Sequence, residues 1–192
     1  MKAVKTMVRY TVNAILGDEP VLLDEVQERV HALPGDEQEE QYTLQPMITA
    51  AREYCEGIAG YAFVRQRITA YPDLADLAAG FVNLPRPPII EIESVTLYRD
   101  DGTSITTDAY ELDGEDGRFY LPADLTELRR VNPVAIQYIA GTTPCPELAR
   151  QAMFLLIGHW YQNRESVQTG AVTAVEIEQT TKAILRQYKR WW

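Results

Sequence analysis

The sequence has no long apolar run, and this absence excludes a helical membrane anchor. Its longest clear apolar run extends from Met153 to Gly158, whereas a membrane-spanning helix needs about 20 predominantly apolar residues. Near the N-terminus, Arg9 and Asn13 interrupt any apolar stretch, and no small-residue cleavage pattern follows. We therefore expect neither a transmembrane helix nor a secretory signal, and no membrane among the partners.

Histidine and cysteine are scarce, which leaves little material for a metal site or a nucleophilic enzyme. The two histidines are His31 and His159, and the two cysteines, Cys55 and Cys145, fit no spaced metal or redox motif. We interpret the cysteines as packing residues in a reducing compartment. We interpret His159 as a core or interface residue, and we expect no metal and no other cofactor.

The sequence motifs of common enzymes are also missing. There is no Gly-x-Ser-x-Gly elbow, no phosphate-binding glycine-rich loop with lysine and no dinucleotide fingerprint. Asp113, Glu115 and Asp116 lack the spacing of a calcium loop, so we predict a glycine-rich turn there. A small hydrolase would need a carboxylate or cysteine with a shifted pKa in a cleft, and no spacing indicates one. The sequence predicts a protein that is not an enzyme and has no catalytic residues.

Positive charge is in deficit, with 18 Lys and Arg against 28 Asp and Glu, a formal charge of -10. Proteins that bind DNA without sequence preference place Lys and Arg against phosphates, so this balance disfavours such binding. Nine carboxylates lie between Asp18 and Glu40 with a single cation, Arg29, whereas the chain is basic from Lys182 onward. Ends of unlike charge suit a subunit that meets different neighbours, although a solvated charged loop explains the acidic cluster equally well.

Apolar residues at helical spacing predict four helices, and the order along the chain is helix, helix, strands, helix, helix. The third predicted helix is apolar nearly all round and should be the main core helix. In the second, Pro46 fits the first turn, where its missing N–H has no partner to lose. The predicted helices span residues 23–32, 45–58, 146–160 and 177–191.

Between Phe63 and Ala140 the apolar period changes to two, which is typical of half-buried strands. Ile92 and Val95 lie at opposite parities, so a bulge near Glu93 is expected to keep both on the inner face. Residues 100–102, Asp-Asp-Gly, predict a tight hairpin between strands 95–99 and 103–107. Further predicted strands are 110–112, 118–121 and 134–140, and residues 6–15 should be extended.

These elements predict a mainly α subunit of the α+β class, with four helices and a small antiparallel sheet inserted between helices 2 and 3. Four motifs follow one another in this order: residues 50–56 (AAREYCE), 84–88 (LPRPP) leading into 95–100 (VTLYRD), 138–141 (YIAG) and 159–165 (HWYQNRE). These motifs and the segment order resemble the head-tail connector (adaptor) family of tailed phages, which includes the connector of phage HK97. The resemblance covers most of the chain. The sequence departs from the family pattern in the acidic loop 34–42 and in a final helix without flanking prolines.

The resemblance implies a structural role in the virion at the head-tail junction, after synthesis and assembly in the bacterial host cytoplasm. Such a subunit assembles as a homo-oligomeric ring, a dodecamer, between the portal protein and a tail stopper or completion protein. Genomic DNA passes through its channel without specific binding. The implied parts are an N-terminal extended arm (1–20), a connector core (21–175) with its β insertion (63–140), and a C-terminal helix with a portal-contacting tail (176–192).

The C-terminal helix and tail reach the portal in such adaptors. Two tryptophans at the C-terminus would expose a large apolar area unless a partner covers them or they fold back on their own domain. The portal-contact candidates are therefore Ile184, Arg186, Tyr188, Lys189, Arg190, Trp191 and Trp192. Amphipathic pattern and analogy give the ring-interface candidates Arg52, Glu56, Trp160 and Arg164.

A second interpretation is a monomeric binding module, either host-surface or ligand-binding, with its site on the β-containing domain. Exposed aromatic side chains clustered on one sheet face would favour it. The predicted strands instead alternate aliphatic and charged residues, and the most apolar element is a helix, so the connector interpretation is preferred.

Overall fold

The computed structural model describes residues 8–30, 37–163 and 179–189. The chain divides into two compact units, each built from two separate stretches of sequence. Of the described residues, 8–17 and 65–141 form the first, here called the β unit, and 18–30, 37–64, 142–163 and 179–189 form the second, the helical unit. The expected division into arm, core and tail at residues 20 and 175 stays a prediction.

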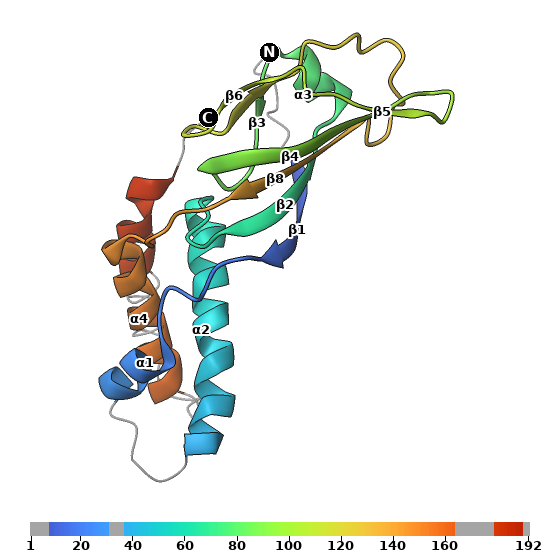
Figure 1. Ribbon diagram of the computed structural model, residues 1–192. Helices are drawn as coiled ribbons and strands as arrows, with labels where there is room; N and C mark the ends of the chain where they lie inside the picture. The colour runs from blue at the N-terminus through green and yellow to red at the C-terminus, as the bar shows by residue number, and fades with distance from the viewer. Residues whose placement is uncertain (1–7, 31–36, 164–178, 190–192) are drawn as a thin grey trace. The chain divides into compact units, whose positions relative to one another are not determined.

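A five-stranded antiparallel sheet dominates the β unit, with the strand order β1-β2-β8-β4-β5 (Figure 1). Its central strand β8 pairs with both β2 and β4, which are remote from it in sequence. The strands are β1 (Arg9–Ile15), β2 (Gln66–Tyr71), β4 (Ile89–Tyr98), β5 (Ser104–Thr106) and β8 (Val134–Ala140). The predicted strand 134–140 and the extended segment are confirmed, the latter from residue 9 onward.

Three short strands form a second antiparallel sheet in the order β3-β7-β6. They are β3 (Val82–Asn83), β6 (Glu111–Asp113) and β7 (Arg118–Tyr120), and a short helix α3 (Leu74–Ala78) precedes them. Residues of both sheets supply the apolar core of the β unit. Its fully buried members include Ile68, Val95, Phe119, Ile136 and Tyr138.

The predicted bulge and hairpin are both present in β4. The register of β4 against β8 shifts between Ile92 and Ser94, and again between Ile89 and Glu91. The shift after Ile92 places Ile92 opposite Tyr138 and Val95 opposite Ile136. These two partners share one face of β8, so Ile92 and Val95 lie on the same face despite their odd spacing. The hairpin to β5 turns at Gly102, whose φ of 85° favours glycine.

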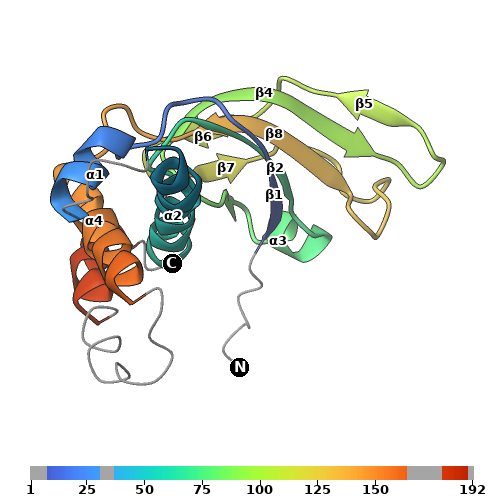
Figure 2. The same cartoon turned by 90° about the horizontal axis from the view of Figure 1, so that it is seen from below.

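Four helical segments surround the core of the helical unit. They are α1 (Leu23–Val30), α2 (Glu37–Ala59), α4 (Glu147–Gln162), and helical residues 179–185, which continue into the 3-10 helix η1 (Arg186–Tyr188). Figure 2 looks nearly along α2 and shows α1 and α4 beside it. The fully buried core of this unit includes Leu44, Ile48, Cys55, Met153, Leu156 and Leu185. No helix in the described ranges is long and apolar enough to cross a membrane.

Helix α2 begins at Glu37, well before its predicted start at residue 45, and Pro46 lies inside it. Residues 37–40, predicted to be part of an acidic loop, are therefore helical. Glutamate and glutamine are good helix formers, and Pro46 is exposed, so its ring meets solvent rather than the core. The proline removes one backbone hydrogen bond without ending the helix.

The predicted fold class, a mainly α four-helix subunit, is wrong. In the described part of the chain, eight strands form two antiparallel sheets, so the fold is a mixed α+β fold. The β structure is also not simply an insertion between two helices, because β1 precedes α1 and pairs with β2. Strands of two or three residues are too short to show a period of two, and pairing between remote segments leaves no local signal.

Gly114 allows a close backbone approach that a side chain would prevent. Its carbonyl oxygen accepts a hydrogen bond from the Ile89 N–H at 2.7 Å, and a Cβ here would lie 2.6 Å from the Ile89 carbonyl oxygen. We expect Gly114→Ala to lower the free energy of unfolding by about 1–3 kcal/mol in urea denaturation, because backbone must shift. The exposed control Ser104→Ala should change it by less than about 0.5 kcal/mol. Equal stabilities would contradict this account.

Candidate interaction surfaces

The described residues contain no cluster of side chains suited to bind a metal ion. Among them, no group of three or more His, Cys, Asp or Glu side chains is placed to hold a metal ion. Burial raises the pKa of the Cys55 thiol and of the Cys145 thiol to about 12. Thiols with such values are almost fully protonated at neutral pH and are poor nucleophiles.

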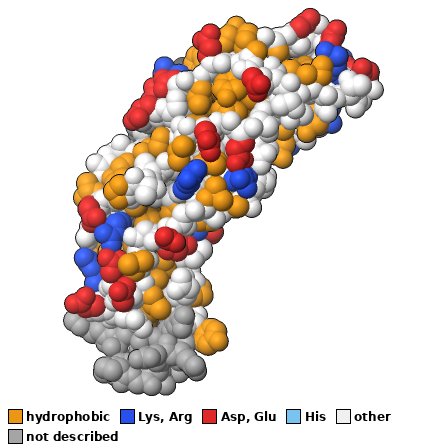
Figure 3. All heavy atoms as spheres, viewed as in Figure 1, with side chains coloured by type: hydrophobic (Ala, Val, Ile, Leu, Met, Phe, Trp, Pro, Cys, Tyr) orange, Lys and Arg blue, Asp and Glu red, His pale blue; other side chains and the backbone are white. Residues whose placement is uncertain are grey.

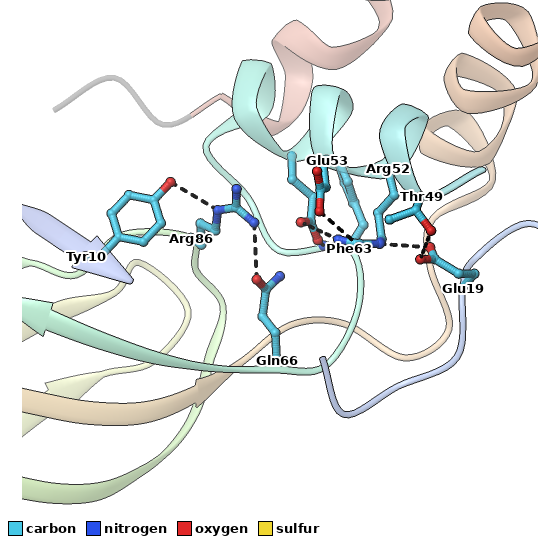
Figure 4. Close-up of polar contacts among 9 residues, drawn as sticks. Tyr10, Glu19, Thr49, Arg52, Glu53, Phe63, Gln66 and Arg86 are labelled. Atoms are coloured by element: carbon cyan, nitrogen blue, oxygen red, sulfur yellow. Dashed lines mark hydrogen bonds and ion pairs between the residues drawn. The ribbon is translucent and has the colours of Figure 1, made fainter. Parts of the chain in front are cut away.

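A buried charge network lies at the middle of α2 (Figure 4). Arg52 is 2% exposed and donates from Nε to Glu19 Oε2 at 2.8 Å and from Nη1 to Glu56 Oε2 at 3.2 Å. The other oxygens of these carboxylates are also used: Glu19 accepts from the Thr49 hydroxyl at 3.0 Å. Glu56 accepts from the Phe63 N–H at 2.9 Å. Each charged group buried here is thus paired.

This network ties the chain before α1 and the chain after α2 to one point on α2. Burial tends to lower the pKa of Arg52, but the hydrogen bond to Glu19 and the adjacent carboxylates outweigh it, so the pKa is raised. Arg52 and Glu56 were predicted at the ring interface, and in the described chain their polar groups have intramolecular partners. Their contact with a second subunit stays a prediction.

The other ring-interface candidates lie at the end of α4 and beyond it. Trp160 is half-buried, and its ring meets that of Tyr54 edge-on with centroids 6.4 Å apart. Arg164 lies outside the described residues. The structure therefore gives Trp160 a packing role within its own unit, and its predicted interface role stays a prediction.

The portal-contact candidates divide into core residues and exposed ones. The Tyr188 ring lies 5.3 Å from that of Phe63 and 5.7 Å from that of Tyr61, measured between centroids. Ile184 packs half-buried against the same helical core. Arg186 and Lys189 are exposed, and Arg190, Trp191 and Trp192 lie outside the described residues. Residues up to Tyr188 thus anchor the segment that leads to the predicted tail.

The segment 84–88, one of the motifs behind the family resemblance, is anchored by Arg86 in the β unit. The Arg86 guanidinium donates to the Tyr10 hydroxyl at 3.2 Å and to Gln66 Oε1 at 3.1 Å (Figure 4). One residue earlier, the Pro85 carbonyl accepts from the buried Tyr138 hydroxyl at 2.8 Å. The motif therefore fastens the connection between β3 and β4 to β1, β2 and β8.

One face of the large sheet carries ion pairs that span β8. Arg67 on β2 and Glu93 on β4 form two hydrogen bonds of 2.7 Å each, and the hydrogen bond from Arg67 lowers the pKa of Glu93. Arg65 and Glu91 lie 3.7 Å apart beside them. Elsewhere acidic side chains are spread over the face seen in Figure 3. These four side chains thus neutralise one another across β8.

Sequence reasoning missed an aromatic patch on the small sheet. Val82 of β3 pairs with Phe119 of β7, and this pairing brings the adjacent residues Phe81 and Tyr120 together at one end of the two strands. The Phe81 and Tyr120 residues are 50% and 42% exposed. The Arg118 guanidinium lies 5.6 Å from the Phe81 ring centroid. Exposed aromatic residues beside arginine are common at binding surfaces. Only the short β3–β7 pairing brings them together.

The family model of head completion proteins matches residues 23–191, and the chain belongs to this family. The family consists of structural virion proteins, which agrees with the predicted role at the head-tail junction. The resemblance to phage connector proteins is confirmed at this level.

Solved structures share the fold at low sequence identity. A chain from the neck of an empty gene transfer agent (GTA) particle, computed with C6 symmetry, has a TM-score of 0.70 at 16% identity, covering 96% of each chain. One from the virion of a native gene transfer agent particle has a TM-score of 0.68 at 18% identity, covering 95% of this chain and 96% of that one. A chain from the neck of a native gene transfer agent particle, computed with C12 symmetry, has a TM-score of 0.64 at 17% identity, covering 97% of each chain. No curated protein matches the sequence.

The Arg52 network predicts a specific pattern of stabilities. Arg52→Met should lower the free energy of unfolding by about 3–5 kcal/mol, because Glu56 would stay buried without its cation. The double variant Arg52→Met/Glu56→Gln should recover much of that loss, since glutamine still accepts from the Phe63 N–H. As a control, Glu53→Gln removes a 64% exposed partner 3.9 Å away and should cost less than about 1 kcal/mol. A double variant no more stable than Arg52→Met, measured in urea, would contradict the network.

Proposed function

We propose that this protein is a head-tail adaptor that forms a homo-oligomeric ring between the portal and a tail stopper or completion protein. The observation that carries the proposal is membership of the head completion protein family over residues 23–191. In the ring, the protein extends the channel through which DNA passes during packaging and ejection. It acts through its surfaces and needs neither a cofactor nor a catalytic group.

A ring of twelve subunits is the proposed assembly. The fold is shared with chains from necks computed with C6 and C12 symmetry, which supports rotational symmetry for this chain as well. The net charge of -10 is suited to a channel wall, because acidic side chains repel the phosphates of passing DNA and let it move. The proposed channel therefore guides DNA without binding it.

The C-terminal segment is the proposed contact with the portal. Tyr188 and Ile184 fix its base against the helical core, and the exposed Arg186 and Lys189 lead from there into the basic, tryptophan-containing end. Arginine and tryptophan are enriched among the residues that contribute most to protein interfaces. An anchor of this composition would bind an acidic, partly apolar portal surface.

Deleting residues 189–192 should abolish portal binding and leave the fold intact, because the aromatic contacts of Tyr188 remain. Co-sedimentation with the cognate portal measures binding, and circular dichroism with urea denaturation checks the fold. The substitution Val131→Arg, at a 69% exposed site in the β unit, is the control and should bind like the wild type. Unchanged binding by the truncated protein would rule out the anchor.

Light scattering of the purified protein, across concentrations and with the portal added, tests the ring itself. We expect a mass of about twelve subunits, for the free protein or for the protein docked on the portal, because cyclic assembly uses two complementary surfaces of each subunit. A strict monomer that ignores the portal would overturn the adaptor proposal. It would favour the binding-module alternative, which the exposed pair Phe81 and Tyr120 supports, and these two residues would then be the first to substitute.

A further inference from the structure

We infer that neighbouring copies in the ring meet through the free faces of α4 and α2, with Leu148 and Leu155 of one copy packed on Ala50 and Gly57 of the next. The inference rests on the proposed ring and names the surfaces that would build it. Both faces belong to the helical unit, so the contact requires nothing of the β unit.

The free face of α4 carries two exposed leucines and no charged residue from 151 to 162. Leu148 and Leu155 are 50% and 41% exposed, and with the exposed Gln162 they repeat every seven residues along one side of the helix. Residues 151–162 contain no Asp, Glu, Lys or Arg, in a chain that is 24% charged. Gly158 lies between these positions with open space where a Cβ would be. A surface helix that faced only water would normally carry charges here.

The free face of α2 is shallow, because two of its exposed residues are small. Between residues 42 and 59, where the burial of α2 is described, the exposed positions are Tyr42, Gln45, Pro46, Ala50, Glu53 and Gly57. Glu53 is the only charged residue in this part of the face, because Arg52 and Glu56 point into the buried network. Ala50 and Gly57 leave the backbone accessible, and nothing lies within 4 Å of a Cβ built on Gly57. Small residues of this kind allow a second helix to approach closely.

A second copy is the occupant that both faces favour. Each face points away from the core that α2 and α4 share, so one molecule presents leucine side chains on one flank and shallow positions on another. Leucines of one helix fill the spaces between residues of a facing helix, and the two faces are complementary to each other rather than to themselves. Unlike surfaces that meet head to tail generate rings, whereas like surfaces stop at dimers.

Cross-linking between engineered cysteines tests this contact in the assembled protein. The variant Leu155→Cys/Ala50→Cys carries one new thiol on each face and is treated with a short bismaleimide after assembly on the portal. The native thiols have pKa values of about 12 and should react slowly at pH 7. We expect most of the protein to run as a ladder of covalent oligomers on a denaturing gel. Leu155→Cys alone and Ala50→Cys alone should stay monomeric.

The control pairs Ala50→Cys with Val131→Cys, an exposed site outside α4, and should give no ladder. Dimers from Leu155→Cys alone would overturn the inference, since they would show α4 meeting α4. A monomeric double variant within rings of normal mass would also overturn it, while the proposed function would stand. If the untreated wild-type protein formed no ring, alone or on the portal, the result would instead count against the proposed function.

Discussion

The helical unit depends on the complete pairing of one buried guanidinium. Arg52 lies at the centre of α2 with 2% exposure, and an unpaired cation there would be costly to bury. Glu19 and Glu56 neutralise it, and the second oxygen of each carboxylate holds Thr49 and the Phe63 N–H. The chain before α1 and the chain after α2 are thereby fixed to one point on α2.

This arrangement has a consequence for the surface. Because α2 turns Arg52 and Glu56 inward, the exposed side of its residues 42–59 carries only Glu53 as a charge. Helix α4 is uncharged over its last twelve residues, 151–162. Elsewhere the chain is well charged: the large sheet carries paired ions such as Arg67 and Glu93. Two weakly charged helix faces on a highly acidic protein are unfavourable for a solitary subunit and favourable for one that assembles.

The two units contain different kinds of contact. The helical unit contains the candidate subunit contacts and the base of the C-terminal segment. The β unit is organised by long-range pairing around β8 and by Arg86, which joins the segment before β4 to Tyr10 and Gln66. It also exposes Phe81 and Tyr120 as a separate surface. In the proposed adaptor role the protein has several neighbours, and two units provide distinct surfaces for them.

Local patterns in the sequence determined much of this protein. Helical periodicity located α1 and α4, opposite parities in β4 required a bulge, and an Asp-Asp-Gly turn placed the hairpin to β5. The extra N-terminal length of α2 was missed because Pro46 resembles a first-turn proline, although an exposed proline can be accommodated within a helix. Family motifs, combined with the absence of enzymatic motifs, pointed to a connector.

Tertiary structure alone decided the rest, because it depends on contacts between residues far apart in the chain. Two sheets instead of one, the pairing of β1 with β2, and the aromatic patch arise from strands too short or too remote to leave a local signal. The amphipathic pattern placed Arg52 and Glu56 on the polar side of their helix, and the fold buried them. Whether a polar side chain faces water or a buried partner is set by what packs against it, and a single helix cannot contain that information.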